Sequence, residues 1–276
     1  LGALTVQPSE FAKFALLLYT AGYLVRQEDA VRHHWQGLAK LIFILGIVAF
    51  LLLLEPDFGA TVIAVGAVVG MMFLAGARLI YVLALLASVA LGFLVLVFSA
   101  PYRLQRLTAY QDPWSDPFGA GFQLVQSLIA FGRGEWFGVG LGNSIQKLFY
   151  LPEAHTDFVF SIWAEETGLF GALLLILLFV GLITRIMQTG WRAAAEGNGF
   201  AAYLCFGVGL MFAGQVFINM GASSGLLPTK GLTLPFVSYG GSSLIMNCAL
   251  LGIVLRIAQQ LRPEQRTDQT VSRRVL

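Results

Sequence analysis

Charged residues are scarce in this sequence. They make up 12% of its 276 residues, whereas soluble domains carry about a quarter, and hydrophobic residues reach 57%. The mean hydropathy is +0.77. This composition excludes a soluble globular protein. The net charge is only +2, and no basic run contains interleaved aromatic residues, which also excludes a nucleic-acid-binding protein.

Cysteine is rare as well. The two cysteines, Cys205 and Cys248, both lie in apolar runs, where a small buried side chain is the usual role, so a disulfide framework is excluded. No second histidine or cysteine stands at metal-ligand spacing from His155. We therefore interpret His155 as a structural hydrogen-bonding residue.

Long apolar runs dominate instead. A helix needs about 20 mostly apolar residues to cross the hydrocarbon core of a bilayer. We therefore predict an all-α polytopic membrane protein. Because the chain begins at Leu1 and leads at once into an apolar run, we expect that upstream spans are missing. Seven transmembrane helices are predicted, at about 9–25, 38–54, 59–77, 79–99, 159–186, 200–222 and 239–258.

The basic residues divide unequally between the two faces that these spans define. One face, with short connections and the tail 259–276, carries 11 of the 17 basic residues, and the other carries five. The positive-inside rule makes the first face cytoplasmic. The predicted organisation is a single transmembrane domain with a large outer loop at 100–157. Ten of the 15 acidic residues fall on the outer side or in the outer ends of spans, which suits a divalent-cation site.

The outer loop 100–157 is too long to be a simple connection. Loops of more than about 15 residues in a compact protein are usually functional or disordered, and the aromatic and apolar residues here indicate order. The stretch from Gly121 to Phe131 is amphipathic. We expect it to lie on the membrane surface or dip into it, with Gln123, Gln126 and Ser127 facing polar groups.

Several charged residues stand in or beside the predicted spans, where they are costly to hold in lipid. Glu10 and Lys13 share a helical face, so they suit an intramembrane ion pair that holds the first span, or a direct role with substrate. Glu55 and Asp57 lie in a tight turn where either can cap the next helix, and capping is the simpler role.

Four outer cations are candidates for contact with phosphate. Arg103 and Arg106 are three residues apart and could present two guanidinium groups to a phosphate or pyrophosphate, or anchor the span at the membrane surface. Lys147 and Lys230 lack this pairing. Each suits either a phosphate contact or a simple anchor.

Acidic residues gather where the fifth span begins. Asp157 sits at a boundary between water and apolar surroundings, which can raise the pKa of a carboxylate and suits a general base for a sugar hydroxyl. The alternative is that Thr156 or Asp157 merely caps the helix. Farther in, at least one of Glu165 and Glu166 should face the bundle interior, and their adjacency should keep both from facing the same way.

The segment 225–243 is too rich in glycine and proline for a continuous helix. Irregular backbone at membrane level needs protein or water around it. Its small and hydroxyl residues, Ser242 among them, permit close packing or contact with a polar ligand. A structural hairpin and a ligand-binding segment both fit this composition.

Five motifs in this order resemble the SEDS family of bacterial cell-wall proteins. Segment 227–235 is more similar to the division branch of that family than to its elongation branch. Members have about ten spans, which implies that about three are absent here. The motifs are QPSEFAK at Gln7–Lys13, EPDFG at Glu55–Gly59, GLGNSIQK at Gly140–Lys147, LPEAHTD at Leu151–Asp157 and SYGGSS at Ser238–Ser243.

The resemblance implies a peptidoglycan glycosyltransferase that polymerises lipid II outside the cytoplasmic membrane. The essential loop aspartate of the family matches Asp157, which would take the proton from the acceptor hydroxyl as the donor carbon inverts. Candidate substrate contacts are Arg103, Arg106, Lys147, Lys230, Gln123 and Ser242. No cofactor is firmly implied, although a divalent cation, Mg²⁺ or Mn²⁺, could assist at the pyrophosphate.

Two other functions fit the same features. A many-span protein with buried ions and broken helices could move lipid II across the membrane as a flippase. It could also be a scaffold of the division machinery without chemistry of its own. In each case the resemblance implies a class B penicillin-binding transpeptidase as partner and a location in the bacterial inner membrane at the division septum.

Overall fold

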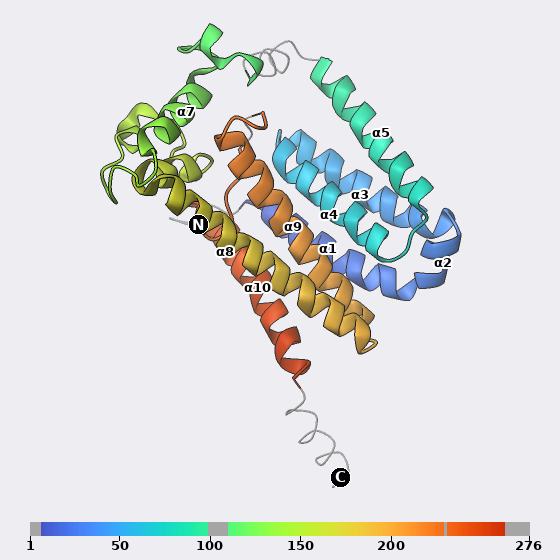
Figure 1. The fold of residues 1–276 in the computed structure, drawn as a ribbon. Coiled ribbons are helices and arrows are strands. Elements are labelled where there is room, and N and C mark those ends of the chain that lie inside the picture. Colours follow the sequence, from blue (N-terminus) through green and yellow to red (C-terminus); the bar gives the residue numbers. More distant parts are fainter. Residues whose placement is uncertain (1–6, 99–109, 229–230, 263–276) are drawn as a thin grey trace.

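The computed structural model describes residues 7–98, 110–228 and 231–262, and every regular element in these ranges is helical (Figure 1). The elements in chain order are α1 (Pro8–Arg26), α2 (Glu28–His33), α3 (Gln36–Leu54), α4 (Phe58–Leu74), α5 (Leu79–Phe98), the 3₁₀ turn η1 (Pro113–Ser115), α7 (Phe122–Gly134), the π turn η2 (Gln146–Tyr150), α8 (Val159–Ala195), α9 (Gly199–Ser223) and α10 (Gly241–Gln260). All seven predicted spans are present as helices.

Four of these helices, α3, α8, α9 and α10, are long and apolar enough by length and composition to cross a membrane. Helix α4 and the segment Leu79–Gly92 of α5 are apolar but shorter. The protein is thus a polytopic helical membrane protein. The structure differs from the prediction at two boundaries: α8 continues to Ala195 instead of residue 186, and the short helix α2 occupies the connection after α1.

Helix α9 is the centre of the bundle and packs against α8, α4 and α1. Small residues along α9 let these neighbours approach closely, as is common between membrane helices. At Gly207, for example, an added Cβ would lie 2.6 Å from the sulfur of Met71 and 3.0 Å from Leu17. The glycines of α9 thus leave room for large side chains of neighbouring helices, such as the fully buried Met71.

The ion pair expected in α1 is present. Lys13 Nζ lies 2.8 Å from Glu10 Oε1, and the two side chains are only 2% and 7% exposed. A charge buried in this way is costly unless a partner neutralises it, so each residue makes the other tolerable within the bundle. This geometry fits the structural role predicted for the pair.

The outer-loop residues that the structure describes gather at one end of the bundle. In Figure 1, α7 lies beside the beginning of α8 and near the end of α9, while α2 lies at the opposite end. Ser127 of α7 is buried and bonds to Ser161 Oγ of α8 and to the carbonyl of Ser223, each at 2.6 Å. The predicted amphipathic stretch is therefore a helix that packs onto the bundle, with Ser127 facing polar groups as expected.

Helix α8 is interrupted at Gly168, whose φ of +68° and ψ of −167° are not helical. The backbone groups freed by this break bond to the segment after α7. Val139 and Gly140 donate to the carbonyls of Glu165 and Glu166, and Leu169 donates to the carbonyl of Glu135. The first two turns of α8 thus form a separate helical piece whose direction depends on the outer loop.

Candidate active site

Asp157 lies in the turn that leads into α8, and its backbone is held from two other parts of the fold. Three successive carbonyls accept hydrogen bonds. His155 accepts from the N–H of Tyr239 at 2.8 Å, Thr156 accepts from Ser238 Oγ, and Asp157 accepts from Asn219 Nδ2 at 2.9 Å. The SYGGSS motif and α9 therefore fix a segment that is far from both in sequence.

The carboxylate of Asp157 is half-buried and has few polar neighbours. A Cβ added at Gly231 would lie 3.2 Å from Asp157 Oδ2, so the loop before α10 passes directly over it. Across the described ranges, no group donates a hydrogen bond to this carboxylate. Burial and then the charges of Glu153 and Asp57 raise its pKa from 3.8 to about 6.

The capping alternative for Thr156 and Asp157 is wrong. The N-cap of α8 is Phe158, and no side chain caps that helix. Thr156 Oγ1 instead bonds to the carbonyl of Glu153 and, at 2.7 Å, to its carboxylate. Asp157 is therefore held by its backbone, which leaves its carboxylate available for chemistry.

Asp57 belongs to the same site, which its place in the sequence did not reveal. It caps α4 as predicted for this turn, because its side chain accepts from the N–H of Ala60 at 2.9 Å. Its charge also acts on Asp157. The loop before α10 contacts both turns. Its Leu232 packs so closely on Gly59 that a Cβ added at Gly59 would lie 2.4 Å from the Leu232 side chain. No local pattern could predict this approach across 100 residues.

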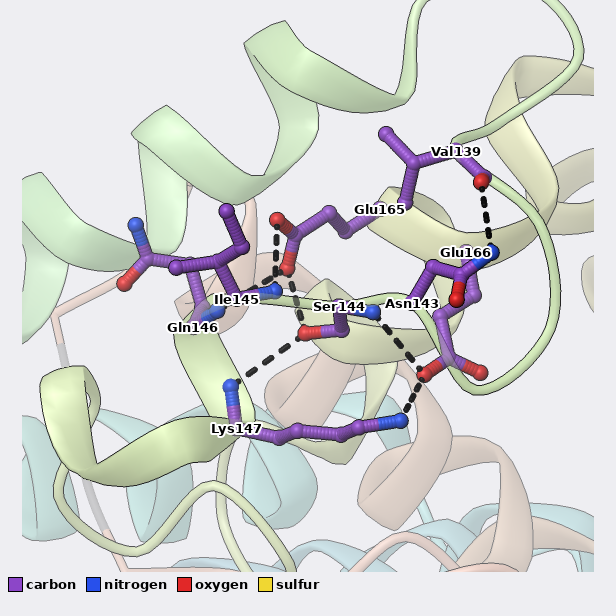
Figure 2. Close-up of polar contacts among 8 residues, drawn as sticks. All are labelled: Val139, Asn143, Ser144, Ile145, Gln146, Lys147, Glu165 and Glu166. Atoms are coloured by element: carbon purple, nitrogen blue, oxygen red, sulfur yellow. Dashed lines mark hydrogen bonds and ion pairs between the residues drawn. The ribbon is translucent and has the colours of Figure 1, made fainter.

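A second pair of acids, Glu165 and Glu166, lies near the beginning of α8 and faces residues 144–147 (Figure 2). Glu165 is fully buried and accepts hydrogen bonds from Ser144 Oγ and from the N–H groups of Ile145 and Gln146. The guanidinium of Arg133, at the end of α7, is 3.5 Å from the same carboxylate. Several donors thus surround the Glu165 carboxylate, and these contacts connect the outer loop to α8.

Glu166 contacts the same loop, which corrects the expectation that Glu165 and Glu166 face different ways. Its carboxylate accepts from the N–H of Ser144 at 3.4 Å and lies 2.6 Å from Lys147 Nζ (Figure 2). Both side chains meet one loop because residues 144–147 curve around the beginning of α8. The charge of Lys147, predicted to contact phosphate, is engaged by Glu166 here.

Two of the other predicted substrate contacts, Gln123 and Ser242, lie within the described residues. Gln123 is exposed on α7, and Ser242 is at the start of α10, where its hydroxyl accepts from the N–H of Gln7 at 3.1 Å. The remaining three, Arg103, Arg106 and Lys230, lie outside the described residues. Arg133 is an outer cation that the sequence did not single out, because nothing in its local pattern predicts its contact with Glu165.

The acids Glu153 and Asp57 lie close enough to act on Asp157, and carboxylates are ligands that Mg²⁺ and Mn²⁺ prefer. Within residues 7–98, 110–228 and 231–262, no group of three or more His, Cys, Asp or Glu side chains is arranged to hold a metal ion. The protein side chains described here thus do not form a ligand set for Mg²⁺ or Mn²⁺.

The fold and this site define a class: a polytopic helical membrane protein that holds an unsatisfied carboxylate at one end of its bundle. The chain belongs to the FtsW/RodA/SpoVE family, described as cell cycle proteins, whose sequence model matches residues 1–263. This is the family that the five motifs resemble.

Curated relatives share this similarity over most of the chain. A protein of Hahella chejuensis named probable peptidoglycan glycosyltransferase FtsW is 56% identical over 97% of this chain and 68% of its own length. A protein of the same name from Pseudomonas fluorescens is 54% identical over 95% of this chain and 64% of its own length. The chain thus spans about two thirds of these relatives.

Solved structures have the same fold. A chain from a study of structural coordination of polymerization and crosslinking by a peptidoglycan synthase complex is 34% identical, with a TM-score of 0.75 over 95% of this chain and 73% of that one. The rod shape determining protein RodA of Thermus thermophilus is 30% identical, with a TM-score of 0.61 over 95% of this chain and 68% of that one. The higher identity to proteins named FtsW agrees with the predicted division branch.

Proposed function

We propose that this chain carries the active site of a peptidoglycan glycosyltransferase that polymerises lipid II at the outer face of the bacterial cytoplasmic membrane. The relatives named FtsW support the reaction class. In this proposal Asp157 is the general base, and the half-buried segment around it receives the sugars while the polyprenyl chains stay in lipid.

The observation that carries the proposal is the state of the Asp157 carboxylate. A general base must bind a proton at the pH of the reaction and must be reachable by the hydroxyl it activates. Asp157 has a pKa of about 6, and no described group donates a hydrogen bond to it. A carboxylate in this state is basic enough to accept a proton near neutral pH and has its oxygen lone pairs free.

The proposed reaction transfers one proton and exchanges one bond. Asp157 takes the proton from the 4-hydroxyl of the acceptor GlcNAc. The hydroxyl oxygen then bonds to the anomeric carbon of the donor with inversion, and the bond from that carbon to the pyrophosphate oxygen breaks. The electron pair of this bond leaves with undecaprenyl pyrophosphate, and Asp157 then releases its proton to water.

The leaving pyrophosphate gains negative charge and needs cations near it. Arg103, Arg106 and Lys230 are the proposed contacts. Lys147 could join them with the N–H donors that remain, since one of its three already bonds to Glu166 at 2.6 Å. A divalent cation would have to draw ligands from the substrate as well as from the protein.

The proposed partner is a class B penicillin-binding transpeptidase, and the proposed location is the division septum. The partner is suggested by the similar chain from a peptidoglycan synthase complex that coordinates polymerization and crosslinking. The septum is suggested by the FtsW relatives.

The function can be tested with the full-length protein and its transpeptidase partner in liposomes that contain labelled lipid II. We expect Asp157→Asn to reduce the rate of glycan polymer formation by about 10²–10⁴-fold, the usual contribution of a general base. Asp112→Asn is the matched control, because it removes one exposed carboxylate from the same outer loop. It should keep the parental rate.

The three candidate functions predict different results in this assay. Equal polymer from Asp157→Asn and parent would contradict the role of Asp157. Movement of lipid II across the membrane without polymer from the parent would favour a flippase. Polymer from the partner alone, at the rate of the complex, would favour a scaffold.

A further inference from the structure

The side chain of Asn219 joins α9 to the segment that carries Asp157. We propose that Asn219 is a positioning residue for Asp157, which holds the backbone of that residue in place so that its carboxylate stays half-buried beside the loop before α10. This inference rests on the proposed function, because it assigns the residue that orients the general base.

The contacts of Asn219 show how it would act. Its Nδ2 group donates to the carbonyl of Asp157 at 2.9 Å and also to the carbonyl of Leu232. Both acceptors are carbonyl oxygens, so the atom facing them must be the amide nitrogen and not the amide oxygen. One buried NH₂ group thus links the turn before α8 to the loop before α10.

The position of Asn219 makes this link rigid. The residue is 2% exposed in the last turns of α9, the most buried of the four candidate spans. Loss of its NH₂ group would leave the carbonyl of Leu232 without a donor and the carbonyl of Asp157 with only the contact from Ser223 Oγ at 3.5 Å, and an unsatisfied buried carbonyl is unfavourable. The segment around Asp157 would therefore be expected to shift until water reaches those carbonyls.

Ser238 completes the attachment from the loop side. Its hydroxyl accepts from the N–H of Leu234 at 2.7 Å and donates to the carbonyl of Thr156. The two bonds hold the residue next to Asp157 against the same loop that Asn219 contacts. Asn219 and Ser238 therefore act on neighbouring carbonyls from two different elements.

A shift of this segment would change the surroundings of the carboxylate. The acids that act on Asp157 are Glu153 from its own turn and Asp57 from the turn before α4. Helix α9 presents the amide of Asn219 and the hydroxyl of Ser223 to this segment, and the exposed His155 lies two residues before Asp157. Lys230, next to Gly231, lies outside the described residues. Hydration of Asp157 would lower its pKa toward the usual range.

The test compares Asn219→Ala with Gln215→Ala in the full-length protein with its partner and lipid II. Gln215 is the matched control, since it lies one turn earlier on α9, is 1% exposed and has no hydrogen bond to the Asp157 segment in the described structure. We expect Asn219→Ala to lower the plateau kcat about 10–100-fold with a smaller change in KM. The acid limb of its pH–rate profile, where kcat falls as the pH decreases, should move about one pH unit lower.

Several results would overturn the inference. An Asn219→Ala protein with the parental plateau and acid limb would do so, as would a Gln215→Ala protein with the same shift. If Asn219→Ala does not fold, Ser238→Ala replaces it and should move the acid limb in the same direction; an unmoved limb would count against the inference. A fully active Asp157→Asn protein would instead contradict the proposed function itself.

Discussion

Two carboxylates at the same end of the bundle, Asp157 and Glu165, differ in how the fold satisfies them. Glu165 is fully buried, accepts three hydrogen bonds and has Arg133 beside it. Asp157 is only half-buried, yet no described group donates to its carboxylate, and its pKa rises to about 6. The less buried acid is therefore the one with no hydrogen-bond donor at its carboxylate.

The comparison shows that burial by itself does not distinguish a catalytic acid from a structural one. A buried carboxylate that accepts several hydrogen bonds is stabilised in its charged form and has little capacity left for a substrate. A carboxylate that is partly desolvated without donors is destabilised in that form and gains basicity. At this end of the molecule the number of hydrogen-bond donors separates the two acids, and in our proposal the acid without donors is the general base.

The largest effect should come from Glu165→Gln, which tests the structural side of the comparison. Glutamine has nearly the same shape, but its NH₂ group would face donors and the charge opposite Arg133 is lost. We expect the free energy of unfolding to fall by about 1–3 kcal/mol for each buried donor left without an acceptor, whereas the partly exposed Arg133 should add little. Thermal unfolding in detergent measures this loss.

The neighbouring ion pair provides the control for that experiment. Lys147→Met removes the partner of Glu166, whose carboxylate is partly exposed. It should change the free energy of unfolding by no more than about 1 kcal/mol, as at other exposed pairs. A Glu165→Gln protein as stable as Lys147→Met would mean that the donors around Glu165 contribute little.

Asp157→Asn should change the free energy of unfolding in the opposite direction and stabilise the protein at neutral pH. The pKa of Asp157 is about 6 in the fold and 3.8 in its absence, so the folded state binds more protons between pH 4 and pH 6. The free energy of unfolding therefore falls as the pH rises through this window and stays lower above it. Asparagine has no carboxyl group to deprotonate, so the variant avoids this decrease. Its free energy of unfolding should exceed that of the parent by up to about 3 kcal/mol at pH 7.5.

Thermal unfolding at two pH values checks this sign. The gain of Asp157→Asn over the parent should be present at pH 7.5 and absent at pH 4. A variant that is less stable than the parent at pH 7.5 would show that Asp157 is a structural acid like Glu165, and the difference between the two residues would disappear.

The smallest effects should come from the acids that act on Asp157. Glu153→Gln and Asp57→Asn each remove a negative charge that raises the pKa of Asp157, so the acid limb of the polymerisation rate should move to lower pH. We expect shifts of less than about one pH unit, larger for Glu153. Asparagine can still cap α4 at Ala60, which keeps the helix start intact.

Asp112→Asn is the reference for these two variants, because its carboxylate is exposed elsewhere on the outer loop. Its acid limb should coincide with that of the parent. A limb shifted equally in all three variants would indicate a general effect of surface charge and not a local one at Asp157.

Much of the fold could be predicted from the sequence, since apolar length and periodicity are local properties. The Glu10–Lys13 pair and the cap at Asp57 follow from residues within one helical turn of each other, and each of the seven spans follows from one continuous apolar run. The break in α8 was not predicted, because Gly168 is one glycine in an apolar run and its φ of +68° depends on the segment that packs on it. An added Cβ there would lie 2.5 Å from the N–H nitrogens of Phe137 and Gly138.

In the candidate site, too, some features could be predicted from local sequence and others depend on tertiary contacts. Asp157 could be recognised as a candidate from its motif and from its place at a helix start, yet the residues alone left it open between cap and base. Tertiary structure excludes the cap and leaves the base as our proposal, because Asn219, Ser238 and Tyr239 hold the backbone of this segment while no described donor holds the carboxylate. Desolvation and charge at one atom depend on groups that approach through space from distant parts of the chain, and a local sequence pattern does not contain them.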